Sequence, residues 1–213
     1  MSDLLQLSPV ECRVLGVLIE KEATTPDAYP LTLNALVTGC NQKTSRDPVL
    51  TLSDTEVQAA LDALRGHTLV TESSGGRTWR YAHNAAKGLR LNSGEIALVA
   101  MLWLRGPQTP GELRIHCERL YKFADVGALE GYLERLALRE PPAVVQLARQ
   151  HGARESRWAH CYSGTPAEPV FESAAPAPSG GARADRLAEL EARVAQLERA
   201  VSDLCAQLGI AGD

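Results

Sequence analysis

Arg80-Tyr81-Ala82-His83 returns near the end of the chain as Arg157-Trp158-Ala159-His160, and this repeated stretch decides the fold. Three earlier matches accompany it: Glu11 with Glu95, Thr25-Pro26 with Thr109-Pro110, and Leu61-Asp62-Ala63-Leu64 with Leu133-Glu134-Arg135-Leu136. The spacing between matched positions changes only where loops are expected. Residues 7–84 and 91–162 are therefore interpreted as two copies of one small fold, which sets the architecture before any other feature does.

Each copy is predicted to contain three helices followed by a β-hairpin. In the first copy Ser8 and Ser53 each precede a glutamate by three positions, which is the capping-box pattern of a helix start. The remaining helix starts are expected at Pro30, Ser93, Thr109 and Asp125. Strands are expected at 49–52, 69–72, 77–81, 144–147 and 156–162. Three helices and a hairpin, in that order, indicate a winged helix.

The predicted fold class is α+β and mostly helical, with two tandem winged-helix domains followed by a C-terminal coiled-coil helix. The segments are a first domain at 1–84, a second at 85–163, a flexible Pro/Ala/Gly/Ser linker at 164–182 and the helix at 183–209. Apolar residues in that helix alternate by three and four positions, which is a heptad pattern that favours a homodimer. They are Leu187, Leu190, Val194, Leu197, Val201, Leu204 and Leu208. The alternative is a lone amphipathic helix that packs on its own chain.

Composition points to an ordinary globular protein, with 45% hydrophobic and 23% charged residues. The longest apolar run, at 96–104, is much shorter than the roughly 20 residues of a membrane span. The first residues lack the basic start and apolar core of a signal peptide. We therefore expect a cytoplasmic protein without membrane contact.

Cysteine and histidine give no pattern of catalysis or metal binding. The five cysteines are widely spaced without C-x-x-C, so neither zinc nor a disulfide framework is expected. Four of them are interpreted as small core residues: Cys12, Cys40, Cys117 and Cys161. No H-E-x-x-H, G-x-S-x-G or P-loop is present. The chain is predicted to be non-enzymatic and to bind no cofactor.

Several long stretches resemble the YceH-like family of bacterial proteins. They are residues 7–22, 30–36, 40–43 and 46–50, in that order along the chain. The resemblance covers residues 5–162, and it implies two winged-helix domains in a bacterial cytoplasmic protein. It supplies no catalytic residues and assigns no function.

The third helix of each copy offers little for reading DNA. If Val57, Leu61 and Leu64 face the core, the outward side of the first copy's helix carries Asp62 and no cation before Arg65. In the second copy the outward residues are Glu130, Gly131, Glu134 and Arg135. Carboxylates oppose phosphates, so these helices argue against the usual major-groove contact.

The hairpins are the better candidates for phosphate contacts. Arg80 and Arg157 alternate with the expected core residues Tyr81 and Trp158 and therefore point outward. Arg77 and Arg154 match at the two wing tips. Together these four arginines would hold phosphates without reading bases. The alternative is that exposed hairpins carry arginine only for solubility and edge protection.

The loop at 41–48 belongs to the first copy alone. It concentrates polar groups where a turn between helices needs only a few residues. One interpretation is a binding surface led by Lys43 and Arg46. The other, slightly favoured, is a loop that satisfies its own hydrogen bonds.

Charge is divided unevenly among the segments. Residues 1–84 carry 7 basic and 10 acidic side chains, residues 85–164 carry 11 and 8, and residues 165–213 carry 4 and 8. Only the second copy has a positive balance. We interpret the chain as a DNA-binding, regulator-like protein. The alternative is a protein-interaction module in which the winged helices dock a protein partner.

Overall fold

The structure is a computed structural model that describes residues 4–74, 78–149, 155–164 and 196. Several sequence predictions lie outside these residues. They are the wing-tip arginines Arg77 and Arg154, nearly all of the linker at 164–182, and the heptad positions of the coiled-coil helix.

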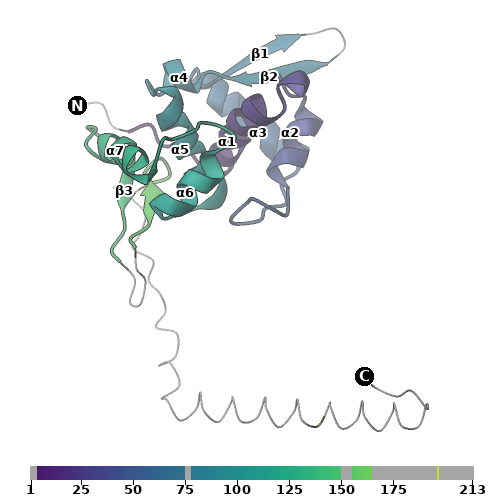
Figure 1. The fold of residues 1–213 in the computed structure, drawn as a ribbon. Helices are drawn as coiled ribbons and strands as arrows, with labels where there is room; N and C mark the ends of the chain where they lie inside the picture. Colours follow the sequence, from purple (N-terminus) through teal and green to yellow (C-terminus); the bar gives the residue numbers. More distant parts are fainter. Residues whose placement is uncertain (1–3, 75–77, 150–154, 165–195, 197–213) are drawn as a thin grey trace. The chain divides into compact units, whose positions relative to one another are not determined.

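The described body is α+β, as expected, with helices and two small antiparallel sheets (Figure 1). The first copy contains α1 (Pro9–Thr24), the short 3-10 helix η1 (Pro26–Ala28), α2 (Leu33–Cys40), α3 (Asp54–Gly66), β1 (Val70–Ser74) and β2 (Trp79–His83). After the connecting α4 (Ala85–Gly88), the second copy contains α5 (Ser93–Arg105), α6 (Pro110–Cys117), α7 (Val126–Ala137), β3 (Val144–Gln146) and β4 (Trp158–His160). Both copies thus have three main helices followed by a hairpin.

Helix caps show how the copies correspond. The N-caps of the three helices are Ser8, Thr32 and Ser53 in the first copy and Asn92, Thr109 and Asp125 in the second. Each cap side chain accepts a hydrogen bond from the backbone three residues on, which satisfies a free N–H group of the first turn.

These caps correct three predictions. The N-cap of α5 is Asn92, and Ser93 is its first helical residue. The second helix of the first copy starts after Thr32 and not at Pro30. Thr25-Pro26 therefore opens the short η1, and Thr32 is the true counterpart of Thr109. The Thr-Pro match was misleading because the same dipeptide starts a 3-10 turn in one copy and an α-helix in the other. The strand expected at 49–52 is absent from those described residues.

The two copies share one hydrophobic core. Helix α5 is almost wholly buried, α1 is buried at residues 12–19, and the two helices pack against each other at the centre of this core. At Gly16 a Cβ would lie 3.1 Å from the side chain of Leu104, so the close approach of the helices needs a small residue there. Figure 1 shows the two hairpins at opposite ends of the body formed around this pair.

One residue outside the two strands pairs with each hairpin through an isolated antiparallel bridge. Leu31 pairs with Tyr81 in the first copy, and Gln108 pairs with Trp158 in the second. Tyr81 and Trp158 are buried, as predicted, whereas Trp79 at the outer end of β2 is 55% exposed. The expected core cysteines, Cys12, Cys40, Cys117 and Cys161, are all buried with free thiols.

No helix in the described ranges is both long and apolar enough to cross a membrane. Those residues also hold no group of three or more His, Cys, Asp or Glu side chains arranged to bind a metal ion.

Candidate functional site at the junction of the two copies

The matched wing arginines make the same backbone contact. Arg80 donates a hydrogen bond of 2.8 Å to the carbonyl oxygen of Pro30, and Arg157 donates one of 2.8 Å to that of Pro107. Each proline directly precedes the residue that bridges to the hairpin. The repeated arginine therefore ties the hairpin to the start of the second helix in both copies.

The two arginines differ in their carboxylate partners. Arg157 forms two hydrogen bonds with Glu112, at 2.9 and 3.0 Å, in the paired geometry that suits a guanidinium and a carboxylate. Burial raises the pKa of Glu112, but the backbone of Thr109 and the charge of Arg157 outweigh it and lower that pKa. The position of Glu112 is taken in the first copy by Ala35. Arg80 therefore has no carboxylate partner in the described part of the chain.

The loop at 41–48 is turned inward. Arg46 is only 6% exposed, and its guanidinium binds both oxygens of Glu20, at 2.6 and 3.1 Å. Asn41 accepts from and donates to the backbone of Leu52. These contacts agree with the slightly favoured interpretation, a loop whose polar groups are satisfied within the protein. Of the two residues named for the other interpretation, a binding surface, Arg46 is buried. Lys43 remains exposed.

This loop closes one side of a pocket at the junction of the copies. The backbone N–H of Asp47 donates to the carbonyl of Leu104, at 2.8 Å, which fastens the loop to the end of α5. The pocket has a volume of about 250 Å³. Its lining is Ser45, Arg46, Asp47, Arg105, Pro107, Gln108, Glu112, His116 and Arg157. Two features that the sequence kept separate, the loop and the second wing arginine, therefore meet here.

A hydrogen-bond chain forms the wall of this pocket. Arg105 can only donate, so the Nε2 atom of His116 accepts its hydrogen bond of 3.1 Å. The Nδ1–H group of His116 then donates to the Oε1 atom of Gln108, at 2.6 Å. The amide of Gln108 donates to the carbonyl of Met101. Burial, and next the charge of Arg105, lower the pKa of His116, which agrees with a neutral imidazole.

Arg13 places a second cation near the loop. It is 2% exposed and donates to the carbonyls of Cys40 and Pro48, at 3.2 and 2.7 Å. Its Nε atom has no hydrogen-bond partner among the described residues, and no carboxylate lies within ion-pair distance there. Burial, and next the charge of Arg46, lower the pKa of Arg13. A cation is therefore buried here with carbonyl oxygens as its hydrogen-bond partners, while the charge of Asp47 raises its pKa.

Sequence analysis missed Arg13, Arg105, Gln108 and His116. Two of them, Arg13 and Gln108, stand out when the two copies are aligned on their observed helix starts. Buried Arg13 of α1 corresponds to Ala97 of α5, and buried Gln108 corresponds to Leu31. A polar residue where the other copy has an apolar one marks a site with an added role.

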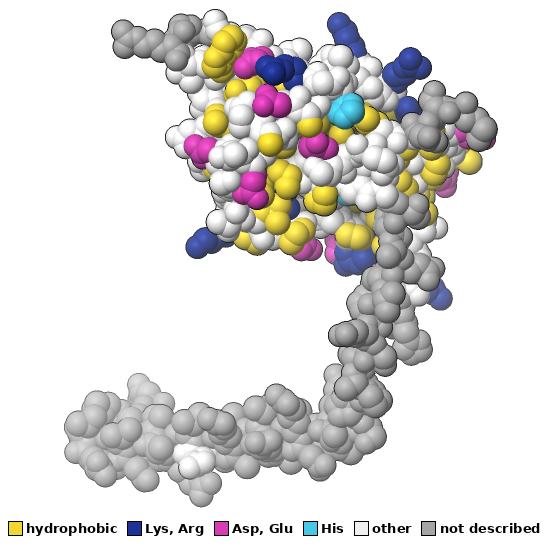
Figure 2. Space-filling view, turned by 180° about the vertical axis from the view of Figure 1, so that it is seen from behind, with side chains coloured by type: hydrophobic (Ala, Val, Ile, Leu, Met, Phe, Trp, Pro, Cys, Tyr) yellow, Lys and Arg dark blue, Asp and Glu magenta, His cyan; other side chains and the backbone are white. Residues whose placement is uncertain are grey.

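The outward faces of the third helices agree with the sequence prediction. Val57, Leu61 and Leu64 of α3 are buried, and so are Leu129, Leu133 and Leu136 of α7. The cation at the end of α3, Arg65, is paired with Asp62 and Glu72. On the face in Figure 2, Lys and Arg side chains are scattered around the outline and do not gather into one patch.

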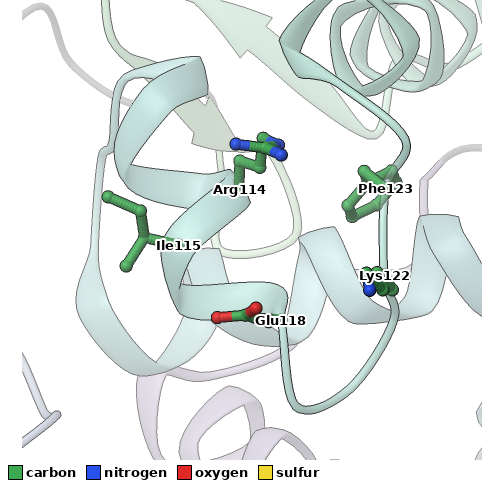
Figure 3. A pocket seen from close by; sticks show the side chains of 5 residues that line it. All are labelled: Arg114, Ile115, Glu118, Lys122 and Phe123. Carbon is green, nitrogen blue, oxygen red and sulfur yellow. The ribbon is translucent and has the colours of Figure 1, made fainter.

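Unpaired cations do gather on α6 and the connection to α7. Arg114, Arg119 and Lys122 are exposed, and within the described ranges none has a carboxylate in ion-pair distance. A shallow hollow of about 90 Å³ lies between them, lined by Arg114, Ile115, Glu118, Lys122 and Phe123. Figure 3 shows Arg114 and Phe123 on opposite sides of the hollow. Ile115 is 69% exposed.

Known proteins similar to this chain share one family description. A family model described as "Protein of unknown function, DUF480" matches residues 7–153. A UPF0502 protein of Leptothrix cholodnii is 49% identical over 96% of this chain and 96% of its own length. UPF0502 proteins of Dechloromonas aromatica and Delftia acidovorans are 48% and 49% identical over at least 93% of either chain.

Proposed function

This chain belongs to the DUF480 family of proteins of unknown function, and we propose that it is a tandem winged-helix protein that binds DNA through phosphate contacts. The order of three helices and a hairpin in each copy, with a bridged third strand, supports the winged-helix assignment. The winged-helix units are the copies at 1–84 and 85–163.

The DNA proposal rests on the exposed Lys and Arg side chains that have no carboxylate partner in the described structure. Arg46, Arg65 and Arg157 are each paired with a carboxylate. Arg80, Lys43 and the cluster on α6 are not, and all are exposed. Exposed unpaired cations are the groups that exchange counterions for phosphates. The acidic third helices argue against the usual major-groove docking, so the proposal assigns the contact to α6 and the first hairpin, without base reading.

Binding of a short mixed-sequence duplex, followed by fluorescence anisotropy over a range of salt, tests this. The variant R114A/K122A should bind more weakly and lower the slope of log affinity against log salt by about 2. The variant R65A/R135A removes the same charge from α3 and α7, where both arginines have carboxylate partners, and serves as the control. Equal losses in both variants, or no binding by the parent protein, would reject the proposal.

The alternative function is docking of a protein partner. It is favoured by the outward face of α7, where Glu130 and Glu134 lie near the exposed apolar residues Val126 and Leu138. Purification of the intact chain from cells separates the two functions. A stoichiometric protein that is lost in the E130K/E134K variant, with no bound nucleic acid, would decide for docking.

Dimerisation through the C-terminal heptads completes the proposal. It rests on the apolar pattern from Leu187 to Leu208. Light scattering on the intact chain should give a dimer, and L197D/L204D should give a monomer. The conservative variant L197M/L204M should remain a dimer. An unchanged mass in L197D/L204D would remove the heptads as the contact.

A further inference from the structure

The pocket at the junction of the copies contains more positive charge than its own carboxylates use. Its lining has three guanidinium groups, on Arg46, Arg105 and Arg157. Two of these are already occupied: Arg46 binds Glu20, and Arg157 binds Glu112. Arg105 is the remaining one, and among the described residues its only hydrogen bond goes to the neutral imidazole of His116.

The donors of Arg105 are mostly free. A guanidinium has five N–H groups, and one of them is used on His116. Ser45, on the loop of the first copy, also lines this pocket, and no hydrogen bond of its hydroxyl is found among the described residues. The free N–H groups of Arg105 and this hydroxyl are donors in the lining of one pocket of about 250 Å³, and such donors suit a small tetrahedral or planar oxyanion.

The lining contains more guanidinium groups than carboxylates. Burial lowers the pKa of Arg105; the charge of Glu20 opposes this shift, and the smaller effect of Arg46 adds to it. Arg13 lies behind the loop without a carboxylate partner. The one carboxylate in the lining without an ion pair in the described structure is that of the exposed Asp47, whose charge raises the pKa of Arg13. An anion in the pocket would therefore give a partner to Arg105, the guanidinium of the lining that has no carboxylate in ion-pair distance in the described structure.

We propose that this pocket is a binding site for a small oxyanion of the phosphate class, held by Arg105 and Ser45. The ligand joins the loop of the first copy to α5 of the second, so it fastens the two copies at the point where they differ most. This site is separate from the exposed cations of α6 that the DNA proposal uses.

Titration calorimetry of the intact protein with inorganic phosphate, at constant ionic strength set with chloride, tests this site. The parent protein should bind one phosphate per chain. R105Q should weaken binding by about tenfold or more, because it removes charged hydrogen bonds, and S45A by about threefold. K87Q removes an exposed charge on α4 and should bind like the parent.

A second experiment separates free phosphate from the phosphates of DNA. R105Q should leave anisotropy binding to the duplex unchanged, while circular dichroism checks that the variant is folded. Saturable phosphate binding that is lost in R105Q and kept in K87Q supports the proposal. Absence of saturable binding, equal binding by R105Q, or a parallel loss of duplex binding in R105Q would overturn it.

Discussion

In both copies an arginine of the hairpin donates a hydrogen bond to a proline carbonyl, but the two arginines differ in whether they also pair with a carboxylate. Arg80 and Arg157 each donate to the carbonyl of a proline, at 2.8 Å in both copies. In the second copy Glu112 then neutralises Arg157, whereas Ala35 in the first copy leaves Arg80 without a carboxylate. A residue that matches between copies can thus be kept for the fold, and the residues that differ indicate where function is added.

Polar substitutions in the core follow the same comparison. Arg13 is buried where the second copy has Ala97, and Gln108 is buried where the first copy has Leu31. Both lie toward the junction that the loop at 41–48 covers. The junction is therefore the region where the copies have diverged in chemistry while keeping the same backbone pattern.

The largest expected effect tests whether the copies are independent. Leu18 of α1 and its counterpart Leu102 of α5 are both fully buried in the shared core. L18A and L102A should each lower the free energy of unfolding by about 2–5 kcal/mol, because each leaves a cavity. The exposed substitution T55A is the control. Urea unfolding, followed by tryptophan fluorescence and circular dichroism, should show one transition in every variant, and two separate transitions would contradict a shared core.

The next effect distinguishes the matched histidines His83 and His160. His83 binds Glu22, whereas His160 lies against Trp103 with its Nδ1 atom unpartnered in the described structure. Burial lowers the pKa of His160 to about 4. Since the folded protein favours the neutral ring, this stability is complete above pH 6.5 and is lost as the pH falls toward 4, by about 3 kcal/mol.

Urea unfolding across that pH range measures the loss. H160Q should reduce the dependence on pH, and H67Q, which changes an exposed histidine, should not. If the parent and H160Q lost stability equally between pH 6.5 and 4, His160 would not be the group that titrates.

A smaller effect is expected when the carboxylate partner of the hairpin arginine is removed from the second copy or introduced into the first. E112A removes both the capping box of α6 and the carboxylate of Arg157, and it should cost about 1 kcal/mol of stability. E112Q keeps the cap, because glutamine also closes a capping box, so it isolates the ion pair and should cost less. A35E installs a carboxylate beside Arg80 and should change stability by about 0.5 kcal/mol or less. Thermal unfolding measures all three, and a larger cost for E112Q than for E112A would contradict this division.

The sequence predicts the features that depend on neighbouring residues and does not predict those that depend on residues far apart in the chain. Capping boxes and apolar spacing are local, so the helix order and most of the buried residues were predicted correctly. The burial of Arg46 depends on Glu20, which is 26 positions earlier and comes close only when the helices pack. The pocket around Arg105 likewise needs α5, α6 and the loop together. No local pattern contains that arrangement.

The matched arginines provide the most direct test of the central claim, that internal pairing decides which cations are available to DNA. The measurement is the salt dependence of duplex binding by R80A and R157A, side by side with the parent protein. R80A should bind more weakly and lower the slope of log affinity against log salt by about 1, because one phosphate contact is lost. R157A should bind like the parent, since Glu112 already holds that arginine. Equal losses in the two variants, or a loss confined to R157A, would contradict the claim.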